Sequence, residues 1–369
     1  MTAQASQNSG GGASPGPTQP GGTRPAASAS ATQMFLEAQS ASEAVRAQLR
    51  EDAKDIATLG AVIRRLAPRA VVTCARGSSD HAATYAKYLI ETRARVLTAS
   101  AAPSVSSVYG IDQDLRGCLF LALSQSGRSP DLLASVAAAK ESGATVIALC
   151  NAADSPLVCA ADHFVPLRAG PEISVAATKS YLASLAAIAR LVGAWTENAP
   201  LQSALNELPA LMDRAWQLDW TRALPLLQTA DHLYVVGRGL GLGAAQEVAL
   251  KCKETCGLHA ESFSSAEVRH GPFTLLGPRF PALLLAQNDA TRPGLEALAN
   301  ELVARGTPVL IAGAATSSGP HVLPSIECAP ELGPILAVQS AYRLVAGLSV
   351  RRGFDPDRPA SLSKITETL

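Results

Sequence analysis

Three short apolar runs, each ending in a turn, constrain the fold more than any other feature of the chain. They cover residues 70–74, 118–123 and 144–150. The runs are continuous and do not alternate with polar residues, which is typical of parallel strands buried on both faces. Helical apolar spacing follows the first two runs. We therefore predict strand–turn–helix units that build a parallel sheet covered by helices on both faces.

The same pattern occurs a second time further along the chain. Residues 232–236, 281–286 and 308–312 again read as strands, and the turn glycines Gly77 and Gly237 are 160 positions apart. Two copies of one unit in one chain indicate an α/β protein made of two tandem doubly wound parallel-sheet domains.

The beginning of the chain differs in composition from both copies. Residues 1–33 are rich in Gly, Ala, Ser and Pro and carry one charge, Arg24. Such a segment buries too little apolar surface to offset its ordering entropy, so we predict a disordered extension, with Met34 as a candidate start of the protein. The predicted organisation is this extension, domains at 34–200 and 215–352, a helical linker around 183–220 and an irregular tail at 353–369.

The composition argues against several classes of protein. Hydrophobic residues make up 47% of the 369 residues, and the formal net charge is zero, which leaves no basic excess for a nucleic acid. Aromatic residues make up 4%, too few for base-stacking surfaces. No uninterrupted apolar run approaches the roughly 20 residues of a membrane span. The seven scattered cysteines favour a reducing compartment, so we expect a cytoplasmic protein.

Cys252, Cys256 and His259 share one helical face, which raises the alternative of a metal site. Structural zinc usually takes four ligands with paired short spacings, and the sequence offers no fourth. We therefore predict that the two thiols pack in the core and that the protein needs no metal.

The loop after residues 118–123 is the strongest candidate for a binding site. Three serines and a glutamine fall within six residues: Ser124, Gln125, Ser126 and Ser129. Ser129 followed by Pro130 is a typical helix start, and a helix N-terminus offers free N–H groups and a positive dipole end to an anion. Gly127 is expected to let the backbone approach a ligand. In the absence of a P-loop lysine, we predict the phosphate of a small molecule; an ordinary serine-rich turn is the alternative.

The corresponding loop of the second copy, residues 287–290, has no serine and carries Asp289. An anion would be repelled there, so we expect one site per chain, in the first copy. Open parallel sheets bind ligands at the carboxyl ends of their strands. The turn with Ser78 and Ser79 ends a neighbouring strand and is expected to line the same crevice.

A charged helical face supplies candidate acid and base groups. Glu247, Lys251 and Glu254 are spaced i, i+4, i+7, and His270 follows in a Gly-Pro turn. Charged residues at this spacing most often form a solvent-exposed face of a helix. A glutamate and a histidine beside a sugar-phosphate site would instead form a natural acid/base pair, which partial burial can tune towards neutral pH.

Taken together and in this order, the motifs resemble the SIS (sugar isomerase) domain family. The resemblance runs from about residue 35 to 369. It rests on the turn at 76–79, the loop at 124–129, the Gly-Pro-Glu-Ile-x-Val-Ala-x-Thr-Lys motif at 170–179, the helix at 247–254, His270-Gly-Pro and Leu-Ser-Lys-Ile-Thr at 362–366. More narrowly, the chain is similar to the SIS-type glucosamine-6-phosphate deaminases and to the isomerase half of glutamine–fructose-6-phosphate transaminase.

The resemblance implies a role for each matching residue. It implies that phosphate and sugar are bound by Ser78, Ser79, Ser124, Gln125, Ser126, Ser129 and Val175. It also implies that Glu254 moves a proton between C2 and C1, supported by Lys251 and Glu247. His270 of a second subunit would assist ring opening. Lys364 matches the lysine that forms a Schiff base with the ketose in the transaminase; in a deaminase the alternative is that it closes the site and stabilises the developing oxyanion. The resemblance also implies a homodimer with a shared active site. It implies that the reaction needs no cofactor.

The implied reaction is the conversion of glucosamine 6-phosphate and water to fructose 6-phosphate and ammonia through an enolamine. The transaminase also has a glutaminase domain with an N-terminal cysteine, for which this sequence has no counterpart, and Arg128 stands where the transaminase has an acid. The alternatives are a galactosamine-6-phosphate deaminase, a fructosyl-amine phosphate deglycase, a glucosamine-6-phosphate synthase and a non-catalytic sugar-phosphate sensor.

Overall fold

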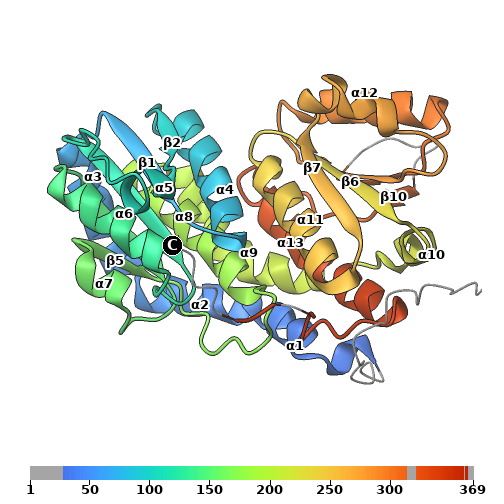
Figure 1. The fold of residues 1–369 in the computed structure, drawn as a ribbon, viewed down its shortest axis with the longest axis horizontal. Coiled ribbons are helices and arrows are strands. Elements are labelled where there is room, and N and C mark those ends of the chain that lie inside the picture. The colour runs from blue at the N-terminus through green and yellow to red at the C-terminus, as the bar shows by residue number, and fades with distance from the viewer. Residues whose placement is uncertain (1–27, 314–320, 361, 365–369) are drawn as a thin grey trace, which may run out of the picture.

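The computed structural model describes residues 28–313, 321–360 and 362–364, which contain two five-stranded sheets (Figure 1). All paired strands are parallel, so the predicted fold class of two tandem parallel-sheet α/β domains is confirmed. The strand orders are β2-β1-β3-β4-β5 and β10-β9-β8-β6-β7. The strands are β1 (Ala70–Cys74), β2 (Thr98–Ser100), β3 (Cys118–Ser124), β4 (Thr145–Cys150), β5 (His163–Pro166), β6 (His232–Gly237), β7 (His259–Ser264), β8 (Ala282–Leu285), β9 (Val309–Ala312) and β10 (His321–Leu323).

The helices of the described residues surround these sheets and lie between them. They are α1 (Gln33–Gln39), α2 (Ala41–Glu51), α3 (Ala53–Leu66), α4 (Ser78–Arg93), α5 (Pro103–Ser107), α6 (Pro130–Glu141), α7 (Pro156–Ala160), α8 (Lys179–Trp195), α9 (Ala199–Gln217), α10 (Leu224–Gln228), α11 (Gly241–Cys256), α12 (Arg292–Ala304) and α13 (Gly333–Arg351). The helical spacing expected from residue 35 to 66 corresponds to three helices. The expected linker at 183–220 is helical, but α8 is buried along nearly its whole length and belongs to the core.

Each sheet separates two layers of side chains. On the first sheet, Phe120 and Val146 pack beneath α6 and α7, whereas Leu119 and Ile147 belong to a core shared by both halves. The second sheet places Val236 beneath α12 in the same way. This alternation explains the continuous apolar runs in the sequence, because both faces of every central strand are covered.

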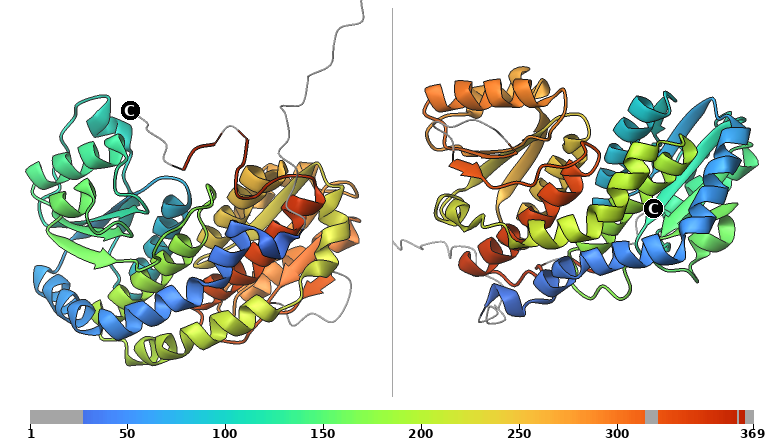
Figure 2. Two further views of the ribbon diagram at one scale, coloured as in Figure 1. Left: turned by 90° about the horizontal axis from the view of Figure 1, so that it is seen from below. Right: turned by 180° about the vertical axis from the view of Figure 1, so that it is seen from behind.

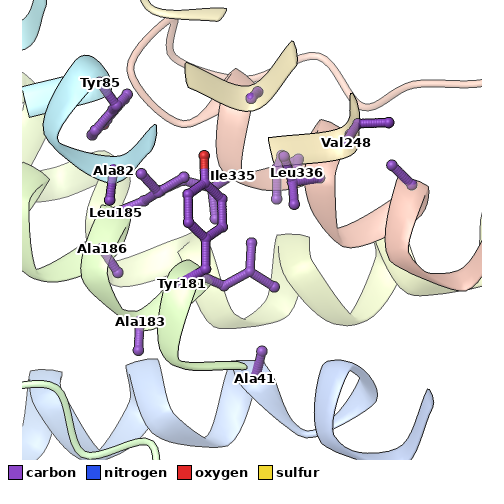
Figure 3. Packing of buried hydrophobic residues seen from close by; sticks show 14 of the residues in the cluster. Ala41, Ala82, Tyr85, Tyr181, Ala183, Leu185, Ala186, Val248, Ile335 and Leu336 are labelled. Atoms are coloured by element: carbon purple, nitrogen blue, oxygen red, sulfur yellow. The ribbon is translucent and has the colours of Figure 1, made fainter. Parts of the chain in front are cut away.

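Helices α4, α8, α11 and α13 bring the two halves together through small side chains. Figure 3 shows Tyr181 of α8 among alanines and the side chains of Ile335 and Leu336. The Tyr181 hydroxyl donates to the carbonyl of Gly243 at 3.1 Å. A Cβ on Gly243 would lie 2.4 Å from the carbonyl oxygen of His81, so glycine here is what lets α11 approach α4.

The segment after α13 returns to the first half of the chain (Figure 2). Its described residues form no helix or strand, as predicted for the tail. The Asp357 carboxylate accepts bonds from the backbone N–H groups of Gln33 and Met34, and the Asp357 carbonyl accepts one from Val175. Of the predicted disordered extension, residues 1–27 lie outside the described residues; the 3₁₀ turn Ala29–Ala31 and the start of α1 occupy the rest.

Candidate functional site

A cavity of about 390 Å³ opens at the carboxyl ends of β1 and β3. From β1 the chain proceeds to β2 on one side of the sheet and to β3 on the other, so this is the switch point where open α/β sheets bind ligands. Helices α4 and α6 begin directly after these strands. Two positive helix ends therefore face one cavity, which favours an anion.

The loop between β3 and α6 has the predicted helix start. Ser129 is the N-cap of α6 and Pro130 its first residue, yet the Ser129 side chain makes no capping hydrogen bond. Its hydroxyl lines the cavity together with Gln125 and Ser126. Ser124 has a second task, because its hydroxyl oxygen accepts the Gly127 N–H at 2.9 Å and closes the turn.

Gly127 was expected to let the backbone approach a ligand, but the structure gives a different reason for glycine at this position. Gly127 has a φ of +65°, and a Cβ there would lie 2.2 Å from the Ser155 hydroxyl and 3.0 Å from the Cys150 sulfur. The missing side chain therefore faces the loop after β4, and Gly127 does not line the cavity. Glycine is needed at this position for the turn and its packing.

Arg76 contributes a positive charge that the sequence analysis did not assign. Its guanidinium lines the cavity and binds the buried carboxylate of Asp131, with nitrogen–oxygen distances of 2.6 and 2.8 Å. Asp131 lies in the first turn of α6. The pair therefore joins the turn after β1 to the helix that follows β3.

The opposite wall of the cavity comes from α11. Lys251 Nζ lies 2.5 Å from Glu254, 3.0 Å from the Ser78 hydroxyl and 3.4 Å from Glu247. Glu247 and Lys251 are almost completely buried, whereas the Glu254 side chain is 20% exposed and lines the cavity. The charged face of this helix is therefore not a solvated stripe, because it points inward onto the turn of Ser78.

Burial and pairing act in opposite directions on these two charges. Burial alone would raise the pKa of the Glu247 carboxyl, but Lys251 and the hydrogen bonds from His81 and Tyr342 hold it below its usual value. Burial alone would lower the pKa of Lys251, but Glu247 and Glu254 together raise it. Lys251 thus stays an ammonium and Glu247 a carboxylate. The Glu254 side chain is the partly exposed member of this group.

Two partners of Glu247 were missed by sequence reasoning. His81 Nδ1 lies 3.0 Å from the Glu247 carboxylate, and the Tyr342 hydroxyl donates to it at 2.8 Å. The Ser78 hydroxyl also donates to Glu247, at 3.1 Å, while accepting from Lys251. A weak signal for His81 existed, because it lies three residues after Ser78 and so shares its helical face. Tyr342 lies on α13 and gave no signal.

The motif at 170–179 combines exposed residues with a buried carboxylate, Glu172, and its Val175 lines the cavity. The Glu172 carboxylate accepts the N–H groups of Thr178 and Ser180 at 3.0 Å, which caps the start of α8, and it accepts the Ser180 hydroxyl at 2.7 Å. Lys364 Nζ donates to the Ser174 carbonyl at 2.6 Å and lies 3.4 Å from Glu172. The tail is thereby fixed over this motif.

A carboxylate from α1 holds the same motif. Glu37 accepts hydrogen bonds from the N–H groups of Ile173 and Ser174. Burial raises the pKa of Glu37, and neighbouring Glu172 raises it further. Lys364 lies close enough to offset part of this repulsion, so the tail lysine also compensates a pair of carboxylates.

The structure brings most of the predicted site residues together. The cavity is lined by ten of them: Ser78, Ser79, Ser124, Gln125, Ser126, Ser129, Val175, Lys251, Glu254 and Lys364. Glu247 lies behind Ser78 and Lys251. His270 does not line the cavity; it is exposed at the end of the 3₁₀ turn Glu267–Arg269. Its role from a second subunit stays a prediction, and residues 365–366 of the closing motif lie outside the described residues.

The equivalent position in the second half is filled from within the chain. The Gln287 side chain donates to the Arg238 carbonyl at 2.7 Å, and Asp289 accepts the N–H and hydroxyl of Thr291. A cavity of about 30 Å³ lies beside Gln287, at the ends of β8 and β9 and against α13. The expectation of a single site, in the first half, stays a prediction.

Cys252 and Cys256 are buried in the shared core, where burial raises the pKa of Cys256 to about 12, while His259 is exposed on β7. Within the described ranges, no three His, Cys, Asp or Glu side chains are placed to hold a metal ion. None of the helices in those ranges combines the length and apolar character needed to cross a bilayer.

Known proteins share both the sequence and the architecture of this chain. The SIS domain model matches residues 67–194 and 226–318. A protein from Silicibacter pomeroyi, provisionally assigned as a phosphosugar isomerase, is 39% identical with a TM-score of 0.85, over 88% of this chain and 100% of that one. The glucosamine-6-phosphate deaminase of Thermotoga maritima has a TM-score of 0.74 over 91% and 100% of the two chains, but at 20% identity it shows the fold alone.

Curated relatives are also similar in sequence to this chain. The glutamine–fructose-6-phosphate aminotransferase of Legionella pneumophila is 32% identical over 306 residues, which is 80% of this chain and 50% of the relative. The chain thus spans about half the length of the curated relatives it matches. Because the family model covers more than half of the chain in two separate segments, one in each half, the chain belongs to the SIS domain family.

Proposed function

We propose that this protein is an amino-sugar phosphate isomerase that deaminates its substrate, converting glucosamine 6-phosphate and water to fructose 6-phosphate and ammonia. The observation that carries the proposal is one cavity with an anion-binding end at α4 and α6 and the carboxylate of Glu254 on its α11 wall. The volume of about 390 Å³ suits a small polar metabolite.

The phosphate is expected at the loop of Ser124–Ser129. Two helix N-termini and the hydroxyls of Ser126 and Ser129 converge there, and Arg76 adds a cation at the rim. Fixing the phosphate would hold the opposite, reacting end of the open-chain sugar near α11.

Proton transfer is assigned to Glu254. In the open-chain aldose, Glu254 removes the C2 proton while the C1 oxygen takes up a proton from solvent, which gives an enolamine. Glu254 then returns its proton to C1 and the nitrogen releases a proton to solvent, which gives an imine at C2. Water then adds to the imine carbon, and the C–N bond breaks to leave the ketone and ammonia. Lys251, held as an ammonium between two carboxylates, is positioned to stabilise charge developing on the sugar oxygen.

Lys364 and His270 are assigned to closure and ring opening. The Lys364 ammonium is held against Ser174 and Glu172 and so would close the cavity mouth behind bound substrate. His270 is exposed and is not among the residues that line the cavity of its own chain, which fits a role in the site of a second subunit. The proposal therefore includes a homodimer.

We favour the hydrolytic direction because it needs only water as the second reactant. Among the described residues that line the cavity there is no cysteine, so the site itself has no thiol for releasing ammonia from glutamine. Synthesis from fructose 6-phosphate and supplied ammonia uses the same proton transfer in reverse and is the second candidate, because the chain shares 32% identity with the Legionella aminotransferase.

The test compares wild type with Glu254→Gln, and with Glu261→Gln as a control at an exposed strand position. We expect Glu254→Gln to abolish turnover of glucosamine 6-phosphate while the substrate still raises its melting temperature, and Glu261→Gln to behave as wild type. Turnover near wild type in Glu254→Gln would show that another group is the base. A sugar phosphate that binds wild type without any turnover would support a sensor instead.

A further inference from the structure

A second pocket, separate from the sugar cavity, lies between α2, α3, α8 and α9. Its volume is about 430 Å³, and it shares no lining residue with the site described above. Helix α8 contacts both, because Ser180 and Tyr181 near its start line the sugar cavity and Arg190 near its end lines this pocket. We call it the Arg190 pocket.

Arg190 is a buried cation, and one of its donor atoms finds no acceptor among the described residues. The residue is 6% exposed, and its Nη1 atom is buried with no hydrogen-bond partner. A buried charge without a partner is costly, and burial lowers the pKa of Arg190. The donors of a guanidinium match a carboxylate geometrically.

The nearest carboxylates are engaged elsewhere. The negative charge of Asp52 acts on Arg190 and partly offsets the effect of burial on its pKa. The Asp52 oxygens, however, accept three hydrogen bonds from Arg168, at 2.5 to 2.9 Å. Glu197, at the rim, pairs with Arg64 at 3.0 Å. Arg64 also donates to the carbonyls of Ala194 and Trp195, so its guanidinium is already bound on several sides.

The charges and the walls define the ligand class. The lining carries two guanidinium groups and one carboxylate, a surplus of one positive charge, which a monoanion would neutralise. One part of the wall is apolar, with Leu49, Ile56 and Leu205 among several alanines, and the neutral amides Gln202 and Asn206 also line the pocket. A phosphate dianion would overcompensate the charge and would leave these walls without an apolar partner.

We propose that the Arg190 pocket binds a small organic monocarboxylate. The carboxylate pairs with the Arg190 guanidinium, and its hydrocarbon chain packs on Leu49, Ile56 and Leu205. The inference is independent of the proposed reaction, because no residue of the sugar cavity takes part in it.

The test measures melting temperature against concentration of sodium hexanoate, with hexan-1-ol and inorganic phosphate as comparison probes at matched ionic strength. Arg190→Met removes the guanidinium, and Arg65→Met removes an exposed guanidinium beside the pocket on α3. In wild type and Arg65→Met, saturating hexanoate is expected to raise the melting temperature by about 2–4 °C, and hexanol is expected to have no such effect. The increase is expected to be absent in Arg190→Met.

Three outcomes would overturn the proposal: no saturable hexanoate effect in wild type, an equal effect of hexanol, or an equal effect in Arg190→Met. Stabilisation by phosphate and not by hexanoate, lost in Arg190→Met, would overturn the assigned ligand class. If Arg190→Met fails to fold, calorimetric titration of wild type decides: saturable heat with hexanoate but not with hexanol supports the pocket, and no heat with hexanoate refutes it.

Discussion

Replacing Lys251 with methionine is expected to destabilise the protein, and to do so most strongly at neutral pH. The lysine is 1% exposed, and its ammonium lies 2.5 Å from Glu254 and 3.4 Å from Glu247. Methionine fills similar space without the charge. The variant therefore leaves the fully buried Glu247 carboxylate beside Glu254 with no cation between them.

The magnitude follows from the burial of the pair. Removing one partner of a buried ion pair costs about 3–5 kcal/mol, because the remaining charge is uncompensated. His81 and Tyr342 still hydrogen-bond Glu247, so we expect a loss of about 3 kcal/mol in the free energy of unfolding at pH 7.5. Such a loss is a large part of the ~5–15 kcal/mol of a typical protein.

The sign of the pH dependence distinguishes this cause from ordinary packing damage. In wild type the pKa of Glu247 is lowered, so its contribution to stability is present above the unfolded pKa of about 4.3 and is lost as the pH falls through the folded pKa. Without Lys251, burial dominates and raises that pKa. The penalty is then greatest at neutral pH and shrinks as the pH falls towards about 4.3.

The assay is urea unfolding of wild type and Lys251→Met at pH 7.5 and pH 5.0. Lys253→Met, at an exposed position on the same helix, serves as the matched control. We expect a clearly smaller deficit at pH 5.0 for Lys251→Met and almost none at either pH for the control. An equal deficit at both pH values, or an equal deficit in both variants, would refute the electrostatic reasoning.

Three further changes test other parts of the structure. Ser126→Ala should raise KM for the sugar phosphate by about 5- to 160-fold, from the loss of about 1–3 kcal/mol of hydrogen bonding, and an unchanged KM would place the phosphate elsewhere. Asp357→Ala should cost about 1 kcal/mol in urea unfolding because the start of α1 loses two backbone N–H bonds and keeps only the cap by Thr32, and unaltered stability would contradict this. Gly127→Ala should lower stability by about 1–3 kcal/mol, with partial rescue by Ser155→Gly if the clash is the cause.

The parts of the fold that could be predicted were those with strong local signals. The strands at 118–124 and 145–150 are apolar throughout, and the Ser129-Pro130 helix start follows from turn chemistry. The edge strands β2 and β10 were missed because each has three residues, too few to show a period. The central place of α8 was missed because an apolar helix reads the same in a linker as in a core.

Side-chain contacts between segments far apart in the sequence limited how much of the site could be predicted. Glu254 and the serines of the loop at 124–129 could be predicted because each belongs to a short motif in the sequence. The partnership of Glu172 with Lys364 spans 192 positions, and that of His81 with Glu247 spans 166. Such pairs depend on how α4, α11 and the tail pack together, which no local pattern encodes. The family resemblance located most of the site, but it gave no reason for the burial of Glu247 and Lys251.

The central claim is that the cavity at β1, β3 and α11 isomerises and deaminates an amino-sugar phosphate. The most direct measurement is the release of ammonia and fructose 6-phosphate from glucosamine 6-phosphate by the purified protein, without glutamine or added metal. The account predicts equimolar release of both products. The account would be contradicted if neither product is released and if, in the reverse assay, supplied fructose 6-phosphate and ammonia are not converted either.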